Sequence, residues 1–342
     1  MTLSQFLTPL AVVAVAVLTT ACGDDDADRA DGDGARAAET RSRLNGADQP
    51  VAGDFPRPKR GQTMQEFADG IGATGTQVAP ATSVFTPGRN RLAFGVLNDE
   101  NAVVYAPTAV YVARSADATE VKGPYVAPAD LLVTEPAYRS RQAASEEDPF
   151  AAVYAADGVQ FDRAGKWVLL AVSKVDGRLV AAPSTVTVAR NSEIPDTGEK
   201  VPVVETDTVA SAGRVEEIDT RVPPAPELHQ RSFKEVVGKK PVALLFATPQ
   251  FCQSRVCGPV VDVALQLRAK YGDRVEFIHQ EVYQDNDTSK GLRPSLAAFG
   301  LQTEPWLFAI DDQGRVAARL EGSFGLEAFE RAVQAAIARS AP

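Results

Sequence analysis

The chain has 342 residues, with 35 Lys and Arg against 45 Asp and Glu, and a formal net charge of -10. This length suggests two domains, and the 44% of hydrophobic residues is enough for each to bury a core. The acidic balance argues against a nucleic-acid partner, because binding to the phosphate backbone requires a basic face. Two histidines and three cysteines exclude a histidine-rich metal site and a disulfide-stapled mini-protein, and we expect no metal and no cofactor.

The first 21 residues have the features of a signal peptide. The apolar run at residues 10–18 is shorter than the roughly 20 residues that span a bilayer, and it has the length of a signal-peptide hydrophobic segment. Small residues lead directly into Cys22, which resembles a bacterial lipobox, whose cysteine is lipidated after cleavage. We therefore expect a lipid anchor on Cys22 that holds the protein at the extracytoplasmic side of the cell membrane. The alternative is an ordinary secretory signal with an incidental Cys22.

Residues 22–75 are expected to form a disordered tether. The segment GDDDADRADGDG at 23–34 is dominated by aspartate and has no apolar side chains large enough to form a core. Pro50, Pro56 and Pro58 interrupt any regular pattern further along.

Residues 76–190 are predicted to form an all-β, immunoglobulin-like sandwich. Alternating apolar residues at 83–99, 109–115, 165–177 and 184–190 are separated by Gly, Asn, Asp and Pro, which is typical of an antiparallel sandwich. No cysteine occurs here, so the sandwich lacks an inter-sheet disulfide. Trp167 is expected in its core. Residues 135–150 are expected to form a long exposed loop.

Residues 191–225 are predicted to be a linker. They contain four prolines and many Thr, Glu and Asp, a composition typical of a semi-extended connection between domains.

Residues 226–342 are predicted to form an α/β domain. A continuous apolar run at 242–246 indicates a buried strand, and apolar residues at helical spacing follow from Pro259 to a capping Gly272. A strand at 274–283, a short helix at 293–300, a hairpin at 306–322 and a closing helix at 325–340 complete the order β-α-β-α-β-β-α.

This order, with cysteines where the first strand turns into a helix, resembles the thioredoxin fold. Cys257-Gly258-Pro259 opens the helix, Glu304-Pro305 precedes the strand WLFAI, and Asp311–Gly314 turns the hairpin. The resemblance covers about a third of the chain and implies a cis Pro305 that faces the cysteines. Such a proline would present backbone to an extended substrate.

The cysteine pair departs from the Cys-x-x-Cys spacing of thioredoxins, because four residues separate Cys252 from Cys257. Residues five apart do not share a helix face, so a Cys252–Cys257 disulfide forms only if Cys252 lies in the loop ahead of the helix. A cysteine at a helix N-terminus has a stabilised thiolate, and Arg255 would add to this effect. We therefore expect Cys257 to be the nucleophile and Cys252 to resolve the mixed disulfide.

The same corner is also similar to Sco-type copper-handling proteins, which carry Cys-x-x-x-Cys-Pro. Those proteins place a histidine before the strand that corresponds to WLFAI, where this chain has Thr303-Glu304-Pro305, so a copper carrier lacks its third ligand.

The expected function is that of a membrane-anchored thiol-disulfide oxidoreductase whose partners are protein thiols or disulfides of the cell envelope. The alternative is a non-enzymatic surface lipoprotein in which the Cys252–Cys257 bond is a structural clip and the domains are binding scaffolds.

Overall fold

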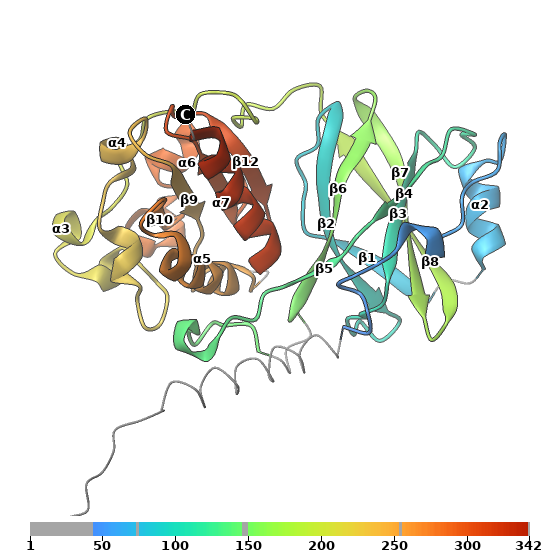
Figure 1. The fold of residues 1–342 in the computed structure, drawn as a ribbon, viewed down its shortest axis with the longest axis horizontal. Helices are drawn as coiled ribbons and strands as arrows, with labels where there is room; N and C mark the ends of the chain where they lie inside the picture. The colour runs from blue at the N-terminus through green and yellow to red at the C-terminus, as the bar shows by residue number, and fades with distance from the viewer. Residues whose placement is uncertain (1–43, 73–74, 146–149, 253–254, 341–342) are drawn as a thin grey trace, which may run out of the picture. The chain divides into compact units, whose positions relative to one another are not determined.

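The computed structural model describes residues 44–72, 75–145, 150–252 and 255–340 (Figure 1). The predicted signal peptide and Cys22 lie outside the described residues. Among the helices that are described, none is long and apolar enough to cross a membrane.

In the part of the chain that the structure describes, the strands form three four-stranded sheets. The first two sheets are antiparallel, in the orders β1-β2-β6-β5 and β4-β3-β7-β8. Their strands are β1 (Thr76–Pro80), β2 (Gly88–Asn98), β3 (Thr108–Ala113), β4 (Lys122–Val126), β5 (Ala129–Leu131), β6 (Ala152–Phe161), β7 (Gly165–Val175) and β8 (Arg178–Val188).

One hydrophobic core lies between these two sheets. Phe94 of β2 and Phe161 of β6 come from the first sheet, and Trp167 and Leu169 of β7 come from the second. The Phe161 and Trp167 rings meet edge to face with their centroids 5.2 Å apart, a favoured geometry for aromatic pairs. Residues 76–188 therefore form a β-sandwich with Trp167 in its core, as the sequence predicts.

The third sheet has the order β10-β9-β11-β12, and β9 pairs in parallel with β10 and antiparallel with β11. Its elements follow the predicted order. They are β9 (Val242–Phe246), α5 (Cys257–Tyr271), β10 (Glu276–Gln280), α6 (Pro294–Ala298), β11 (Trp306–Ile310), β12 (Val316–Glu321) and α7 (Leu326–Ser340), preceded by α4 (Phe233–Val236).

Both faces of the third sheet are covered because successive side chains of a strand point to opposite sides. Leu245 packs in one core with residues of α5 and α7, whereas Leu244 and Phe246 pack in the other with Phe233 of α4 and Leu296 of α6. This is why the strand reads as a continuous apolar run in the sequence. The Gly314 N–H donates to the Asp311 carbonyl at 3.0 Å and closes the predicted hairpin turn.

The prediction of disorder through residue 75 is wrong for residues 44–72. Leu44 lies in the sandwich core, and α2 (Met64–Ile71) packs through Met64 and Phe67 against a cluster that includes Tyr111. Thr63 and Glu66 form a capping box at the start of α2, with mutual side-chain to backbone bonds of 2.9 and 3.1 Å. The sequence signal for this helix is short, because it consists of the capping-box residues Thr63 and Glu66 and the few residues that follow the last of the prolines.

The linker prediction for residues 191–225 is also wrong, because this segment packs along the third sheet. Ile194 and Val201 are buried in its core, and the Val201 N–H donates to the Gly314 carbonyl at 3.1 Å. The segment includes the four-residue helix α3 (Val209–Ala212) and ends in a buried stretch at residues 219–221. The prolines and acidic residues predict a segment with little regular secondary structure. They do not indicate whether that segment is exposed to solvent or packs on a sheet.

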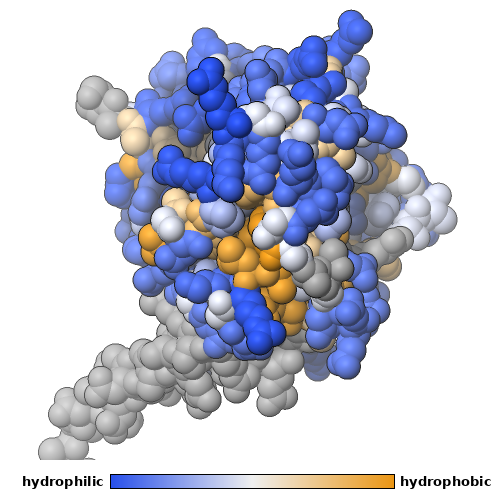
Figure 2. All heavy atoms as spheres, turned by 90° about the vertical axis from the view of Figure 1, so that its right-hand side faces the viewer, coloured by the Kyte–Doolittle hydropathy of each residue, from blue (hydrophilic) through white to orange (hydrophobic). Residues whose placement is uncertain are grey.

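The apolar residues are largely internal. Figure 2 shows one face of the molecule on which hydrophilic side chains predominate and apolar atoms gather in a small central area. Among the described residues, the large hydrophobic side chains that remain exposed are scattered, namely Val51, Phe150, Val203 and Val222. Single exposed residues of this kind are normal for a folded domain.

Candidate redox site

The two cysteines lie where β9 gives way to α5. The Cys252 N–H donates to the Thr248 carbonyl at 3.1 Å, so Cys252 sits in the loop that follows the strand. Arg255 then takes a left-handed backbone conformation with φ 60° before α5 begins at Cys257. This placement meets the geometric condition that the spacing sets, because Cys252 is outside the helix.

The structure has Cys252 and Cys257 in the thiol form and brings their side chains into hydrogen-bonding contact. Both are buried, but not equally: Cys252 is 9% exposed and Cys257 is fully enclosed. A disulfide between them remains a prediction. The difference in exposure makes Cys252 the thiol that a partner reaches first.

The expected lowering of the Cys257 pKa is wrong. Burial raises the pKa of the Cys257 thiol well above its ordinary value, and the contact with Cys252 raises it further, against a smaller opposing hydrogen bond from the Thr248 backbone. A helix N-terminus stabilises a thiolate only where desolvation does not cost more. At Cys257 the cost of desolvation is larger.

A loop from the sandwich seals the first turn of α5. The described part of the loop predicted at 135–150 is exposed at many positions, as expected, but its middle packs on α5: Ser140 donates from its backbone N–H and its hydroxyl to Asp262 Oδ2, both at 3.0 Å. A Cβ added to Gly258 would lie 2.5 Å from Gln142 Cβ, so only glycine fits against this loop. The covering loop explains why Cys257 has no solvent access.

Pro305 directly follows Glu304, whose carboxyl group interacts electrostatically with both cysteines. The Glu304–Pro305 peptide bond is cis, as the thioredoxin resemblance implies, and the Pro305 carbonyl accepts a hydrogen bond from Gly322 N–H at 2.8 Å. Burial and the proximity of Cys252 raise the pKa of Glu304, which interacts electrostatically with both cysteines. A catalytic role for Pro305 stays a prediction.

Aromatic residues flank the pair. Phe251 packs edge to face on Tyr283 with the ring centroids 6.2 Å apart. Burial raises the pKa of Tyr283, and electrostatic interactions with Glu304 and both cysteines raise it further. Trp306 is fully buried, stacks on Phe308 and donates from Nε1 to Thr303 Oγ1 at 3.0 Å. Trp306 is therefore a core residue, whereas Phe251 is placed at the site.

A cavity of about 880 Å³ opens beside the cysteine loop. Arg255 and Val256 line it from the loop, and Thr303 and Glu304 line it next to Pro305. Its mostly apolar wall continues along Ala79–Ser83, Ala152–Tyr154 and Phe150. The volume lies within the range of pockets that hold small molecules or peptide side chains.

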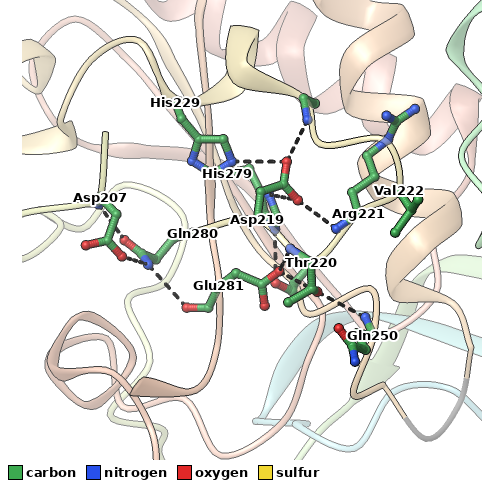
Figure 3. A network of polar contacts seen from close by, with 12 residues as sticks. Asp207, Asp219, Thr220, Arg221, Val222, His229, Gln250, His279, Gln280 and Glu281 are labelled. Atoms are coloured by element: carbon green, nitrogen blue, oxygen red, sulfur yellow. Dashed lines mark hydrogen bonds and ion pairs between the residues drawn. The ribbon is translucent and has the colours of Figure 1, made fainter. Parts of the chain in front are cut away.

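Beneath the same corner lies a buried polar network that the sequence does not announce (Figure 3). Asp219 faces both histidines of the chain: its Oδ2 is 3.4 Å from His229 Nε2 and its Oδ1 is 3.7 Å from His279 Nδ1. All three side chains have no solvent exposure. Burial alone would raise the pKa of Asp219, but the imidazoles outweigh it and lower this pKa to about 2.

The network also braces the strand end that leads to Cys252. His279 Nε2 is 3.0 Å from the Ala247 carbonyl, and Thr220 Oγ1 accepts from the Gln250 N–H at 3.1 Å. Thr220 in turn donates from its backbone and hydroxyl to Glu281 Oε1 at 2.8 and 2.7 Å. Burial lowers the pKa of His279 and raises that of Glu281.

Sequence reasoning missed this network for identifiable reasons. Asp219 lies in the stretch assigned to the linker, and His229 and His279 are 50 positions apart, so no local spacing connects them. His279 falls within the predicted strand at 274–283 and His229 precedes the predicted strand at 242–246, so the sequence offered no signal that joins them.

Comparisons with known proteins leave the family open. No family model matches the chain, and no curated protein matches it. Among solved structures, the chain is similar to the PKD domain of the human VPS10 domain-containing receptor SorCS2, with 14% identity over 35% of this chain and 76% of that one and a TM-score of 0.18. It is also similar to an endo-beta-1,4-mannanase from Thermotoga petrophila, with 11% identity, coverage of 36% and 21%, and a TM-score of 0.19. Scores this low carry no argument about fold or function.

Proposed function

We propose that this chain is an exported, lipid-anchored protein with a thioredoxin-like α/β domain and an immunoglobulin-like sandwich, and that its Cys252–Cys257 pair exchanges disulfides with proteins of the cell envelope. The observation that carries the proposal is the contact between the thiol of Cys252, in the loop after β9, and that of Cys257, the first residue of α5, near Glu304. The strand and helix order around this corner supports it.

The unequal burial of the thiols supports different roles for them, in the reverse of the order expected from the sequence. Cys252 retains some exposure and lies on the loop next to the cavity residues Arg255 and Val256, so it is the attacking thiol. Cys257 has a raised pKa and no exposure, so it acts only on a sulfur that is already bonded to Cys252. Exchange requires a thiolate, and access limits which thiolate reacts.

The exchange conserves atoms and electrons. The Cys252 thiolate attacks one sulfur of a client disulfide, a mixed disulfide forms, and the second client sulfur leaves as a thiolate. Cys257 transfers its proton to the departing client thiolate and attacks the Cys252 sulfur, and the client sulfur that is bonded to Cys252 leaves as a thiolate that takes a proton from solvent, which releases the client as a dithiol. The client gains two electrons and the Cys252–Cys257 pair loses two, and a thiol reductant of the envelope would restore the pair.

Single-cysteine variants test this order of attack, in a chain whose Cys22 is replaced by serine so that no third thiol interferes. Cys257→Ser leaves Cys252 and is expected to accumulate a mixed disulfide with oxidised glutathione in the native protein. Cys252→Ser leaves the sealed Cys257 and is expected to react at least ten times more slowly. Intact-mass spectrometry measures both.

The matched control is each variant in denaturant, where both thiols are exposed and must react at similar rates. Native Cys257→Ser protein that forms no mixed disulfide would remove the proposal. Faster reaction of native Cys252→Ser would instead restore Cys257 as the nucleophile.

The burial of both sulfurs favours a second candidate, a surface lipoprotein in which a Cys252–Cys257 bond is a static clip. Closing so short a loop would stabilise the fold by about 2 kcal/mol in the chain-entropy model. In that case Cys252→Ser with Cys257→Ser lowers the free energy of unfolding and leaves partner binding through the sandwich or the cavity intact.

A further inference from the structure

We propose that Asp219, His229 and His279 form a binding site for one divalent transition-metal ion, with zinc the best match to its ligands. The site is separate from the cysteine pair and does not rest on the proposed exchange reaction. One ligand atom from each of the three residues lies within 4.8 Å of the other two, and all three side chains are buried (Figure 3).

The spacing of the ligand atoms matches a tetrahedral ion. Zinc binds imidazole nitrogen and carboxylate oxygen at about 2.0–2.2 Å, so two ligands of a tetrahedral site lie about 3.3–3.5 Å apart. The Asp219 Oδ2 to His229 Nε2 distance is 3.4 Å and the Asp219 Oδ1 to His279 Nδ1 distance is 3.7 Å. The two distances involve different oxygens of Asp219, and one ligand atom from each residue lies within 4.8 Å of the others, so the cluster must contract around the ion to complete the coordination.

The nitrogen atoms that face Asp219 make no hydrogen bond. His279 Nδ1 and both ring nitrogens of His229 are fully buried and without a hydrogen-bond partner. His279 Nε2 lies 3.0 Å from the Ala247 carbonyl, and that oxygen can only accept, so Nε2 carries the proton. In the neutral ring Nδ1 then directs a lone pair at the Asp219 carboxylate, which repels it. A cation bound between the two groups would remove this repulsion.

Outer contacts orient the carboxylate as they do at known metal sites. The Arg221 N–H donates to Asp219 Oδ1 at 2.9 Å and the Ala225 N–H donates to Oδ2 at 2.7 Å, so each oxygen keeps a lone pair directed at a histidine. The bond from His279 to the Ala247 carbonyl fixes the other ring in the same way. Partners of this kind hold ligands in place and typically contribute 10–100-fold to metal affinity.

The donor set selects the class of ion. Two imidazoles and a carboxylate suit zinc and its neighbours in the first transition row, whereas calcium and magnesium prefer oxygen alone. Glu281, whose Oε2 is buried without a hydrogen-bond partner, adds a second acidic group that interacts electrostatically with His279.

Zinc stoichiometry after refolding is the direct test, because a site with no exposure is filled most readily during folding. The chain is produced without a polyhistidine tag, so that His229 and His279 are its only imidazoles. It is refolded with excess zinc chloride and dialysed, and zinc is measured by elemental mass spectrometry. We expect one zinc per chain and, in a histidine-selective nitrogen NMR spectrum, displaced signals from both rings.

Two variants separate this site from the cysteines. His229→Gln with His279→Gln removes two of the three ligands and is expected to abolish stoichiometric zinc binding, while Cys252→Ser with Cys257→Ser retains one zinc per chain. Cobalt as a probe is expected to show no thiolate charge-transfer band in either the parent or the cysteine variant. Far-ultraviolet circular dichroism establishes that each variant is folded.

Fewer than about 0.1 zinc per refolded parent chain would overturn the proposal, and so would one zinc retained by the folded histidine variant. A thiolate band with cobalt, lost in the cysteine variant, would instead place the ion on the sulfurs. Because the readouts are stoichiometry and ligand spectra, failure here leaves the exchange proposal standing, and failure of exchange leaves this site standing.

Discussion

The sandwich and the α/β region differ in what they bury. Between residues 76 and 190, Asp130 is the one charged side chain that is buried in the part of the chain that the structure describes. The α/β region and the segment packed on it bury more acidic and basic side chains, namely Asp219, Arg221, Asp262, Glu281, Asp311 and Glu321, together with the imidazoles of His229 and His279. Burying a charge costs free energy of desolvation unless the charge is paired. Apolar packing therefore accounts for the stability of the sandwich, whereas the α/β region must offset the desolvation of its buried polar groups.

Asp130, the buried charged residue of the sandwich, caps a helix of the α/β region. Asp130 follows β5's first residue and accepts hydrogen bonds from the backbone N–H groups of Gly325, Glu327 and Ala328 at the start of α7, at 2.9–3.0 Å. The comparison therefore attributes the stability of the sandwich to apolar packing, and that of the α/β region, which also holds the candidate sites, to buried groups that must stay paired. Substitutions in each region should separate these two sources of stability.

The largest effect is expected from breaking the buried pair of Arg221 and Asp262. Arg221 Nε donates to Asp262 Oδ1 at 2.8 Å, and the two side chains are 3% and 1% exposed. Arg221→Met would leave the carboxylate buried and unpaired, and we expect the free energy of unfolding to fall by about 3–5 kcal/mol in urea denaturation.

The exposed pair of Arg231 and Glu235 provides the matched control. Their side chains are 52% and 58% exposed, so Arg231→Met is expected to cost less than about 1 kcal/mol. Equal losses from the two substitutions would contradict the view that the α/β region depends on buried charge.

A cavity in the sandwich is expected to lower stability without touching the chemistry. Leu169 is 1% exposed in the sandwich core, and Leu169→Ala should cost about 3 kcal/mol. The rate at which iodoacetamide modifies Cys252 in the native protein should stay unchanged. A change in that rate would mean that the sandwich controls access to the thiols, and the division between the regions would not hold.

Removing the Asp130 cap should have an intermediate effect. Asp130→Ala leaves three backbone N–H groups at the start of α7 without their acceptor, and we expect a loss of about 2 kcal/mol by thermal or urea unfolding. Asp130→Asn keeps one acceptor oxygen and should lose less. Similar losses for both variants would show that charge, not hydrogen bonding, stabilises this end of α7.

The smallest effect concerns pH. Burial raises the pKa of Cys257 above its ordinary value of 9.0, so the folded, reduced protein keeps this proton while the unfolded chain releases it. The stabilisation is complete below pH 9 and is lost as the pH rises toward the folded-state pKa, at about 1.4 kcal/mol per pH unit. Cys257→Ser should remove this slope, and an identical decline in both proteins would contradict the burial of the thiol.

The elements of the fold were largely predictable, because periodicity and turn residues are local. The runs at 242–246 and 306–310 are apolar at every position since both faces of the third sheet are covered, and the hairpin turn at Asp311 was read from its residues. The predictions that failed were those of disorder or free linkers in the polar segments. Whether residues 191–225 lie free or pack on a sheet depends on contacts with distant residues such as Gly314, which composition does not encode.

The candidate site was predictable in position but not in environment. The spacing and Pro259 indicated correctly that Cys252 lies ahead of a helix that begins at Cys257. The loop that seals Cys257 comes from more than 110 positions earlier in the chain, through Gln142, so its desolvation was not visible locally. The three buried residues Asp219, His229 and His279 meet only after folding for the same reason.

The central claim is that Cys252 and Cys257 form a labile pair, and its reduction potential tests this most directly. The protein, with Cys22 replaced by serine, is equilibrated in glutathione buffers of graded potential, and alkylation of the remaining thiols is measured by mass. We expect a reversible two-electron transition above about -300 mV, outside the range of structural disulfides. A bond that stays oxidised below that potential, or a pair that never forms a bond, would contradict the account.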